Sequence, residues 1–288
     1  LEERNFEDGE HKIRPLVEVE GRNVFLVQSL FFDNKDSIND KICKTLFLIA
    51  TFKQNHAKSV TAVLPYMAYS RKERQTKPYD PVTSRYMALL LEGAGCDGVM
   101  SMDIHSLSAF QNAFRCPTYH LQAKELFVHY FKQKARKGDW LVVSPDIGGV
   151  KRAENFRASL QQTSERKIGL GFFEKKRSQG EVSGEIFAGD VENKNIIIVD
   201  DMIATGTTIK RASVHCREKG AEKVFVAATH GLFVVEASEL LAEAPLDELV
   251  IMDTVPSSHR LAPELKSKLK VLSSAPVIAE KIRESVKL

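Results

Sequence analysis

Residues Ile196–Ile209 read IIIVDDMIATGTTI and are the part of the chain that most clearly predicts its fold. Its four leading apolar residues predict a strand that is buried on both faces of a parallel sheet. Two acids, Asp200 and Asp201, follow this strand, and a short loop rich in threonine and glycine leads into a helix. Ligands of open α/β sheets bind at the carboxyl ends of the strands, so the stretch also predicts a ligand site.

The loop in this stretch has the chemistry of a phosphate site. Thr205–Thr208 would present backbone N–H groups and hydroxyls at a helix N-terminus, and Gly206 permits close approach of the backbone. Asp200 and Asp201 would repel a phosphate, but they can accept hydrogen bonds from vicinal sugar hydroxyls or hold a metal bound to them. Sugar hydroxyls beside a phosphate predict a pentose phosphate as the ligand. The alternative is an ordinary acidic turn before a capped helix.

Strands and helices alternate along the whole chain, which predicts an α/β fold with open sheets and helices on both faces. The predicted strands are Val24–Ser29, Ser59–Leu64, Gly98–Met102, Leu141–Ser144, Ile168–Phe173, Ile196–Val199, Val224–Ala228 and Glu248–Met252. One helix is expected to start after a Ser37 cap. The others are expected near Val82–Glu92, Ala123–Gln133, Arg152–Leu160, Thr208–Lys219 and Glu236–Ala242.

Length and composition narrow the class of protein. The chain has 288 residues, 43% of them apolar, and a net charge of +3. This length allows about two domains, and we place the boundary near residue 121. The mild, dispersed basic excess predicts no nucleic acid partner and would suit a phosphorylated substrate. No apolar run reaches about 18 residues and no signal peptide is visible, so we expect no membrane span and a cytoplasmic location.

The four cysteines are far apart, without CxxC or zinc-like spacing to histidine. Cys43, Cys96 and Cys216 lie in apolar or helical stretches. We therefore expect buried free thiols in a reducing compartment.

Further motifs carry a resemblance to a known family. In chain order they are FEDGE (6–10), LPYMAYSRKER (64–74), DPVT (80–83), MDIH (102–105), VSPDIGGV (143–150), EKKR (174–177) and THGLF (229–233). Together with residues 196–209, they resemble the ribose-phosphate diphosphokinase (phosphoribosyl diphosphate synthase) family over nearly the whole chain. The resemblance implies two tandem phosphoribosyltransferase-like domains. These would be 1–121 on the ATP side and 122–276 on the ribose 5-phosphate side, with a helix of about 277–288 packing back on the first.

The resemblance also implies an activity: transfer of the diphosphoryl group of MgATP to the 1-hydroxyl of ribose 5-phosphate. Lys175 and Arg177 would be catalytic, on a loop that closes over the nucleotide. The ATP-binding residues would be Phe6, Asp8, Glu10, Arg71, Lys72, Glu73 and His105. The ribose 5-phosphate-binding residues would be Asp146, Asp200, Asp201, Thr205, Gly206, Thr207 and Thr208. His105 and Asp146 would serve Mg²⁺, which needs few protein ligands.

In the family the first of these motifs reaches the adenine from a neighbouring subunit, which implies a dimer-based homo-oligomer such as a hexamer. Each assignment has a plainer alternative. Taken alone, Lys175–Arg177 reads as a solvated basic cluster, His105 as a structural histidine, and Phe6 as core packing.

The sequence departs from the family pattern at several positions. Lys72 and Glu73 replace Gln and Asp of the family's RQD, Ala204 stands where Asp is usual, and Thr207 stands where Gly is usual. The segment 30–36 is longer than its family counterpart near a regulatory region for phosphate and ADP, so we do not carry that regulation over.

Two other functions fit parts of the sequence. A phosphoribosyltransferase would use the same loop in reverse, but it is usually one shorter domain. A non-catalytic regulatory paralogue would keep the fold and assemble with active subunits. Release of AMP from ATP without an added nucleobase would distinguish the diphosphoryl transfer from the reaction of a phosphoribosyltransferase.

Overall fold

The structure is a computed structural model that describes residues 1–178, 181–256 and 261–286, without the side chains of 175–185. The chain divides into two compact units. One consists of Leu1–Gln122 with Ala275–Leu288, and the other of Ala123–Ser274. Both units combine parallel strands with helices, which confirms the predicted α/β class.

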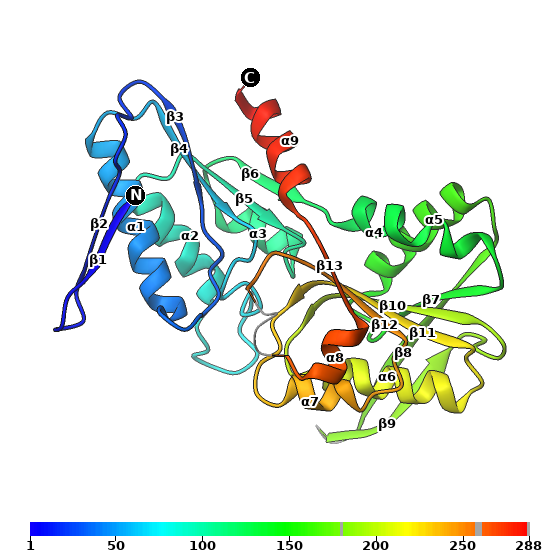
Figure 1. Ribbon diagram of the computed structural model, residues 1–288. Helices are drawn as coiled ribbons and strands as arrows, with labels where there is room; N and C mark the ends of the chain where they lie inside the picture. The colour runs from blue at the N-terminus through cyan, green and yellow to red at the C-terminus, as the bar shows by residue number, and fades with distance from the viewer. Residues whose placement is uncertain (179–180, 257–260, 287–288) are drawn as a thin grey trace. The chain divides into compact units, whose positions relative to one another are not determined.

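The first unit is built on a four-stranded parallel sheet in the order β3, β4, β5, β6. A two-stranded antiparallel hairpin, β1–β2, lies beside helix α1, and helix α9 packs against β6 (Figure 1). The strands are β1 (Glu2–Asn5), β2 (His11–Arg14), β3 (Asn23–Val27), β4 (Ser59–Leu64), β5 (Gly98–Met102) and β6 (Thr118–Leu121). The helices are α1 (Ile38–Gln54), α2 (Thr83–Gly93), α3 (Leu107–Ala113) and α9 (Ala275–Val286).

Helix α1 starts where its sequence predicts. Ser37 has extended backbone angles, and its side chain accepts a hydrogen bond from Asp40 N at 3.2 Å. The Asp40 carboxylate accepts one from Ser37 N at 2.8 Å, which completes a capping box. The hairpin is fastened to this helix by a His11–Phe47 ring stack and an ion pair between Glu3 and Lys44.

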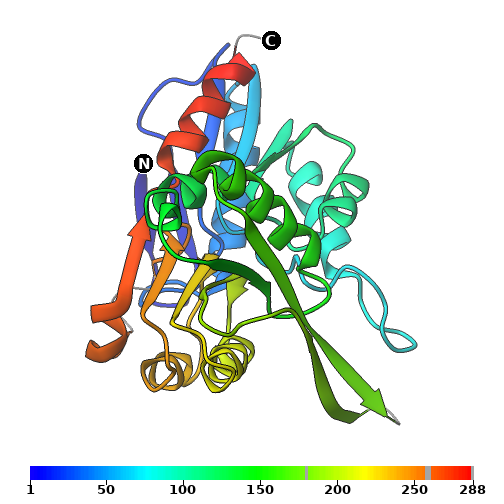
Figure 2. The same cartoon turned by 90° about the vertical axis from the view of Figure 1, so that its right-hand side faces the viewer.

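The second unit holds a seven-stranded sheet in the order β13, β12, β11, β10, β7, β8, β9, parallel except for β9. Its strands are β7 (Trp140–Ser144), β8 (Ile168–Ser178), β9 (Glu181–Ala188), β10 (Asn195–Ile203), β11 (Lys223–Gly231), β12 (Glu248–Met252) and β13 (Leu269–Leu272). Its helices are α4 (Lys124–Phe131), η1 (Lys134–Arg136), α5 (Val150–Ser164), α6 (Thr207–Glu218), α7 (Ala237–Ala242) and α8 (Pro263–Lys268). Helices α4 and α5 cover one face, and α6, α7 and α8 cover the other (Figures 1 and 2).

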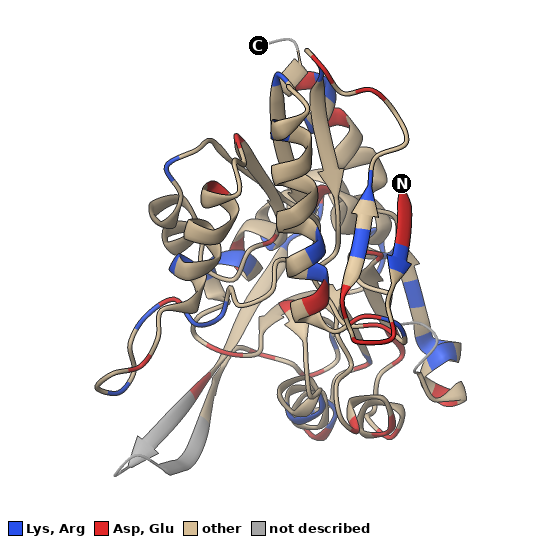
Figure 3. Ribbon diagram, turned by 90° about the vertical axis from the view of Figure 1, so that its left-hand side faces the viewer, with Lys and Arg blue, Asp and Glu red and all other residues tan. Residues whose placement is uncertain are grey.

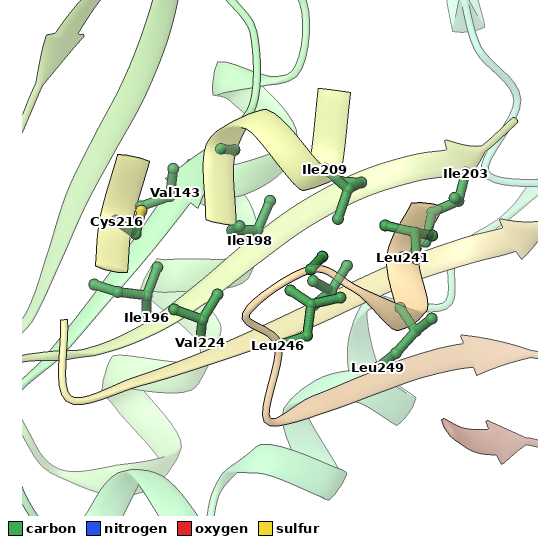
Figure 4. Packing of buried hydrophobic residues seen from close by; sticks show 14 of the residues in the cluster. Val143, Ile196, Ile198, Ile203, Ile209, Cys216, Val224, Leu241, Leu246 and Leu249 are labelled. Atoms are coloured by element: carbon green, nitrogen blue, oxygen red, sulfur yellow. The ribbon is translucent and has the colours of Figure 1, made fainter. Parts of the chain in front are cut away.

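Strand β10 is buried on both faces, as its apolar run predicts. Ile196 and Ile198 pack under α6 with Ile209, Cys216 and Val224 (Figure 4). The opposite face of the sheet lies under α5, where Phe156 packs edge-on against Phe131 of α4. Burial on both faces explains why this strand shows no alternation of apolar and polar residues.

Two predicted strand ends are wrong. Strand β10 does not stop at Val199 but continues through Asp200 and Asp201 to Ile203, because β11 runs beside it as far as Gly231. Strand β8 does not give way to a loop at Lys175 but continues to Ser178 and returns as β9. Charged residues are depleted in strands, so both extensions depend on pairing with a neighbour that the local sequence does not reveal.

All four cysteines are free, but their burial differs from the prediction. Cys96 and Cys216 are buried as expected, and Cys116 is half-buried. Cys43 is exposed, because it lies on the outer side of α1, so the expectation of a buried thiol there is wrong. No helix in the described part of the chain is both long and apolar enough to cross a membrane.

Thiol chemistry tests this arrangement. Burial raises the pKa of Cys216 to about 12, so very little of this thiol is ionised at pH 8. The ionised fraction rises only as the pH approaches that pKa. We expect a disulfide reagent at pH 8 to modify Cys43 rapidly and Cys216 only after unfolding, as mass spectrometry of digested samples would show. Modification of Cys216 in the folded chain at the rate of Cys43 would contradict the packing under α6.

Candidate functional site

Asp200 and Asp201 lie in the part of β10 that extends beyond its pairing with β7. Pairing between β10 and β7 ends at Ile198–Val143, whereas pairing with β11 continues beyond the two acids. The edge of β10 that faced β7 is therefore open at these positions. Both side chains are still shielded, with 16% of Asp200 and 6% of Asp201 exposed.

The two carboxylates share one cation, Arg152 of α5. Arg152 Nη1 lies 3.5 Å from Asp200 Oδ1, and Nη2 lies 3.6 Å from Asp201 Oδ2. Burial raises the pKa of Asp200 well above its usual value, and the neighbouring Asp201 raises this pKa further, while Arg152 lowers it. The site is therefore acidic and polar, and it strongly favours ligand groups that donate hydrogen bonds.

The loop after β7 brings Asp146 to the same place. Asp146 Oδ1 accepts a hydrogen bond from Gly149 N at 2.9 Å, and Ser144 Oγ donates to the Asp146 carbonyl at 2.6 Å. A Cβ atom at Gly149 would lie 2.7 Å from Ser144 Oγ, 3.5 Å from Arg152 Nη1 and 3.6 Å from Asp146 Oδ1. Asp146 and Arg152 thus both lie close to Gly149. Any larger residue at position 149 would collide with the Ser144 side chain.

The threonine loop ends at the start of α6, which has a glycine at its N-cap and no side-chain cap. Gly206 is the N-cap of α6 with φ +76°, and no side chain caps the helix. Thr205 Oγ1 and Thr207 Oγ1, both on exposed residues, lie 3.3 Å apart beside this first turn. No side chain therefore caps the N–H groups of the first turn, and N–H groups at a helix N-terminus have the orientation that binds an anion.

The loop is held from below by apolar packing. A Cβ atom at Gly206 would lie 2.9 Å from Leu241 Cγ of α7. Leu241, Ile203 and Ile209 belong to the same buried cluster, at the loop end of β10 and α6 (Figure 4). The segment after β11 adds backbone bonds, from Leu232 N to the Ile203 carbonyl at 2.9 Å and from Val234 N to the Ala204 carbonyl at 3.0 Å.

In the first unit, two predicted segments lie at one sheet edge. Arg71–Glu73 follow β4 and His105 follows β5, and these adjacent strands are parallel, with Leu64 beside Ser101. Met67 and Ser70 from the first loop line a small cavity with Ile104 and Ser106 from the second. Arg71 and His105 are both exposed.

Lys72 is engaged within its own loop. Its Nζ lies 2.5 Å from Asp80 Oδ2, which also accepts hydrogen bonds from Thr76 N and Lys77 N at 3.0 Å each. The hydrogen bond from Lys72, together with those from Thr76 and Lys77, holds the pKa of Asp80 below its usual range. Glu73 Oε2 is buried without a hydrogen-bond partner in the described part of the chain.

The turn to His105 is strained. Asp103 has φ +38°, in the left-handed region that an aspartate seldom occupies. Its carboxylate lies 4.0 Å from His120 Nε2 on β6. Such strain is often found at functional sites, and here it directs the chain from β5 toward His105. Among the described residues, no three His, Cys, Asp or Glu side chains gather as a metal cluster.

Phe6, Asp8 and Glu10 form the turn of the β1–β2 hairpin. Phe6 N donates to the Glu10 carbonyl at 2.8 Å, and the Arg4 guanidinium lies 4.9 Å from the Phe6 ring. Phe6 is 39% exposed, so the alternative of core packing is wrong. Acidic residues gather at this turn (Figure 3).

The structure brings some of the predicted site residues together and leaves the side chains of others undescribed. It brings Asp146, Asp200 and Asp201 together, with Thr205–Thr208 a few residues further on. The backbone of Lys175 and Arg177 lies in β8, but their side chains lie outside the described residues. Sequence reasoning missed Arg152, because the predicted helix began at that residue. Helix α5 begins at Val150, so Arg152 lies in its first turn.

Two mainly parallel sheets with polar loops at their carboxyl edges define an α/β protein of the class that binds phosphorylated ligands at strand ends. Comparison with known proteins makes this specific. Residues 1–95 match the model of the N-terminal domain of ribose phosphate pyrophosphokinase, and residues 175–287 match that of the phosphoribosyl synthetase-associated domain.

Curated relatives agree. The chain is 37% identical to ribose-phosphate pyrophosphokinase of Clostridium acetobutylicum, over 96% of this chain and 83% of the relative. It is also 37% identical to that of Wolinella succinogenes, over 96% and 85%. The crystal structure of phosphoribosylpyrophosphate synthetase from Mycobacterium smegmatis superposes with a TM-score of 0.88 at 34% identity, over 99% of this chain and 90% of that one. The chain belongs to the ribose-phosphate pyrophosphokinase family.

The support under the threonine loop can be tested with paired glycines. Gly206 and Gly220 have φ of +76° and +84°, so alanine at either should cost about 1–3 kcal/mol in backbone strain. Only at Gly206 does the added Cβ meet buried Leu241, which should cost about 1–3 kcal/mol more. We expect urea denaturation to show a larger loss of unfolding free energy for Gly206→Ala than for Gly220→Ala. Equal losses would contradict the packing of the loop on α7.

Proposed function

We propose that this chain transfers the diphosphoryl group of MgATP to the 1-hydroxyl of ribose 5-phosphate, giving 5-phosphoribosyl 1-diphosphate and AMP for nucleotide biosynthesis in the cytoplasm. One observation carries the proposal: an uncapped helix start with two threonine hydroxyls lies directly after a pair of shielded carboxylates. Membership of the ribose-phosphate pyrophosphokinase family supports it.

The ribose 5-phosphate side uses the second unit. The 5-phosphate would bind the first-turn N–H groups of α6 and the hydroxyls of Thr205, Thr207 and Thr208, because a helix N-terminus favours an anion. Asp200 and Asp201 would accept hydrogen bonds from the ring hydroxyls. Gly206 keeps the backbone within reach of the phosphate, since it carries no side chain.

The ATP side uses the first unit. Arg71 would pair with phosphate oxygens, since its guanidinium donates in a planar fork. Lys72 would act through the loop that it closes with Asp80. Glu73 and His105 would be the other ATP-binding residues of the loops that follow β4 and β5. Phe6, Asp8 and Glu10 would reach the adenine of a neighbouring subunit, which makes a homo-oligomer part of the proposal.

Mg²⁺ would be served by His105 and Asp146. Mg²⁺ keeps several waters and phosphate oxygens in its coordination shell, so a sparse protein set is adequate. A carboxylate offers about four lone-pair sites, so Asp146 retains acceptor capacity beyond its bond from Gly149 N. When bound, the ion would supply charge neutralisation on the ATP phosphates.

Chemistry at the reacting centre would follow from positioning and charge. The anomeric oxygen forms a bond to the β-phosphorus, the bond from that phosphorus to the bridging α,β-oxygen breaks, and AMP leaves. The hydroxyl proton is lost to solvent, and we assign no general base. Lys175 and Arg177 would stabilise the charge that grows on the β-phosphoryl oxygens.

The first test is the reaction itself. The full chain with ATP, Mg²⁺ and ribose 5-phosphate should release AMP without any nucleobase, which a phosphoribosyltransferase would not do. Lys175→Ala should lower kcat about 100- to 1,000-fold, the range for loss of one donor to a developing oxyanion. Lys167→Ala, at the opposite end of β8, serves as the control. Unchanged turnover in Lys175→Ala would remove this residue from the reaction, and no AMP from the parent chain would favour a non-catalytic paralogue.

A further inference from the structure

Arg152 is the cation that touches both carboxylates of the β10 pair. It lies in the first turn of α5, directly after the Gly148–Gly149 loop. One guanidinium nitrogen faces Asp200 at 3.5 Å and the other faces Asp201 at 3.6 Å. The Arg152 side chain is 29% exposed, so it is the outermost of the three groups.

This bridge requires an open strand edge. Successive side chains of a strand point to opposite faces, so adjacent acids normally diverge. A single group can reach both only from the edge of the strand. That edge is open here because pairing with β7 ends at Ile198, two residues before Asp200.

The distances between the Arg152 guanidinium and the two carboxylates indicate that Arg152 positions these groups without using all of their acceptor capacity. A tight charge-assisted N–H···O bond measures about 2.7–2.9 Å, so contacts of 3.5 and 3.6 Å leave the carboxylate oxygens with acceptor capacity. Asp201 N also donates to Asp200 Oδ1 at 2.8 Å, which fixes one oxygen of the pair. The remaining acceptors can serve neighbouring hydroxyls of a ligand.

Asp200 and Asp201 are the last acids before the threonine loop, because Ala204, which directly precedes Thr205, carries no acceptor in its side chain. Within this segment of the chain, two vicinal hydroxyls would then depend on Asp200 and Asp201. An error in the spacing of these two carboxylates would affect both hydroxyls at once.

We propose that Arg152 is a positioning residue, which holds Asp200 and Asp201 in the spacing that accepts the vicinal hydroxyls of the pentose phosphate. The proposal deepens the proposed function and rests on it. Arginine is needed because its planar fork spans two carboxylates, whereas a lysine ammonium is a point charge that can satisfy only one position well.

Binding without turnover gives the test. Ribose 5-phosphate and 2-deoxyribose 5-phosphate are titrated calorimetrically into the full chain without nucleotide. Arg152→Met should weaken ribose 5-phosphate about 10- to 100-fold, the range for losing charge-assisted hydrogen bonds, and the 2-deoxy sugar by a clearly smaller factor, because it keeps only one of the two hydroxyls. Arg152→Lys should fall between Arg152→Met and the parent chain. Lys151→Met removes an exposed neighbouring charge on the same helix and should leave both affinities within about 2-fold.

The outcomes separate the two proposals. Equal losses on both sugars, or no loss on either, would overturn the positioning role of Arg152, because a purely structural role cannot sense one hydroxyl. If Arg152→Met does not fold, Arg152→Lys decides, and equal losses on both sugars would again overturn the role. A parent chain that binds ribose 5-phosphate but releases no AMP would refute the proposed reaction and leave the Arg152 result valid. A parent chain that does not bind ribose 5-phosphate would overturn both.

Discussion

The central constraint on the second unit is the burial of two adjacent carboxylates in β10. Shielded charges are costly unless they are paired, and here one loosely placed guanidinium serves two of them. The folded-state pKa of Asp200 lies above its unfolded value, so ionising this group costs stability as the pH rises through the range above about 4. A ligand that donates hydrogen bonds to the pair would offset this cost, which is the usual logic of a functional site.

The surrounding structure serves the same edge of the sheet. Strand β11 pairs with β10 beyond Asp200 and Asp201, whereas the pairing of β10 with β7 ends before them. The backbone after β11 donates hydrogen bonds to carbonyls at the start of the threonine loop. Gly149 and Gly206 each stand where a side chain would collide with a neighbour, Ser144 in one case and Leu241 in the other. In the first unit Asp103 accepts a strained backbone angle at the corresponding end of β5. These three positions, Gly149, Gly206 and Asp103, all lie in segments that follow the carboxyl end of a strand.

The sequence predicted the fold class because its strongest signals are local. Unbroken apolar runs such as Ile196–Val199 identify buried parallel strands, and Ser37 marks a helix start. Both β10 and β8 proved longer than predicted, since their extensions carry charged residues that only pairing across the sheet explains. The burial of the Cys43 thiol was predicted wrongly, because the prediction rested on the helical stretch as a whole and not on the side of the helix where Cys43 lies.

The candidate site was predicted by motif more than by geometry. Asp146, Asp200 and Asp201 are far apart in sequence, and the order of the strands brings them together. Arg152 was not predicted because its role depends on where α5 begins, and the predicted helix began two residues later than α5 does. For Lys72, the sequence could not reveal that Asp80 pairs with it across its own loop.

A crystal structure of the chain with ribose 5-phosphate would show whether the two carboxylates and the threonine loop bind one ligand. We expect the 5-phosphate to contact the first-turn N–H groups of α6 and the hydroxyls of Thr205 and Thr207. We also expect the 2- and 3-hydroxyls to donate to Asp200 and Asp201. A sugar phosphate bound elsewhere, or one turned so that its hydroxyls face away from the two carboxylates, would contradict this expectation.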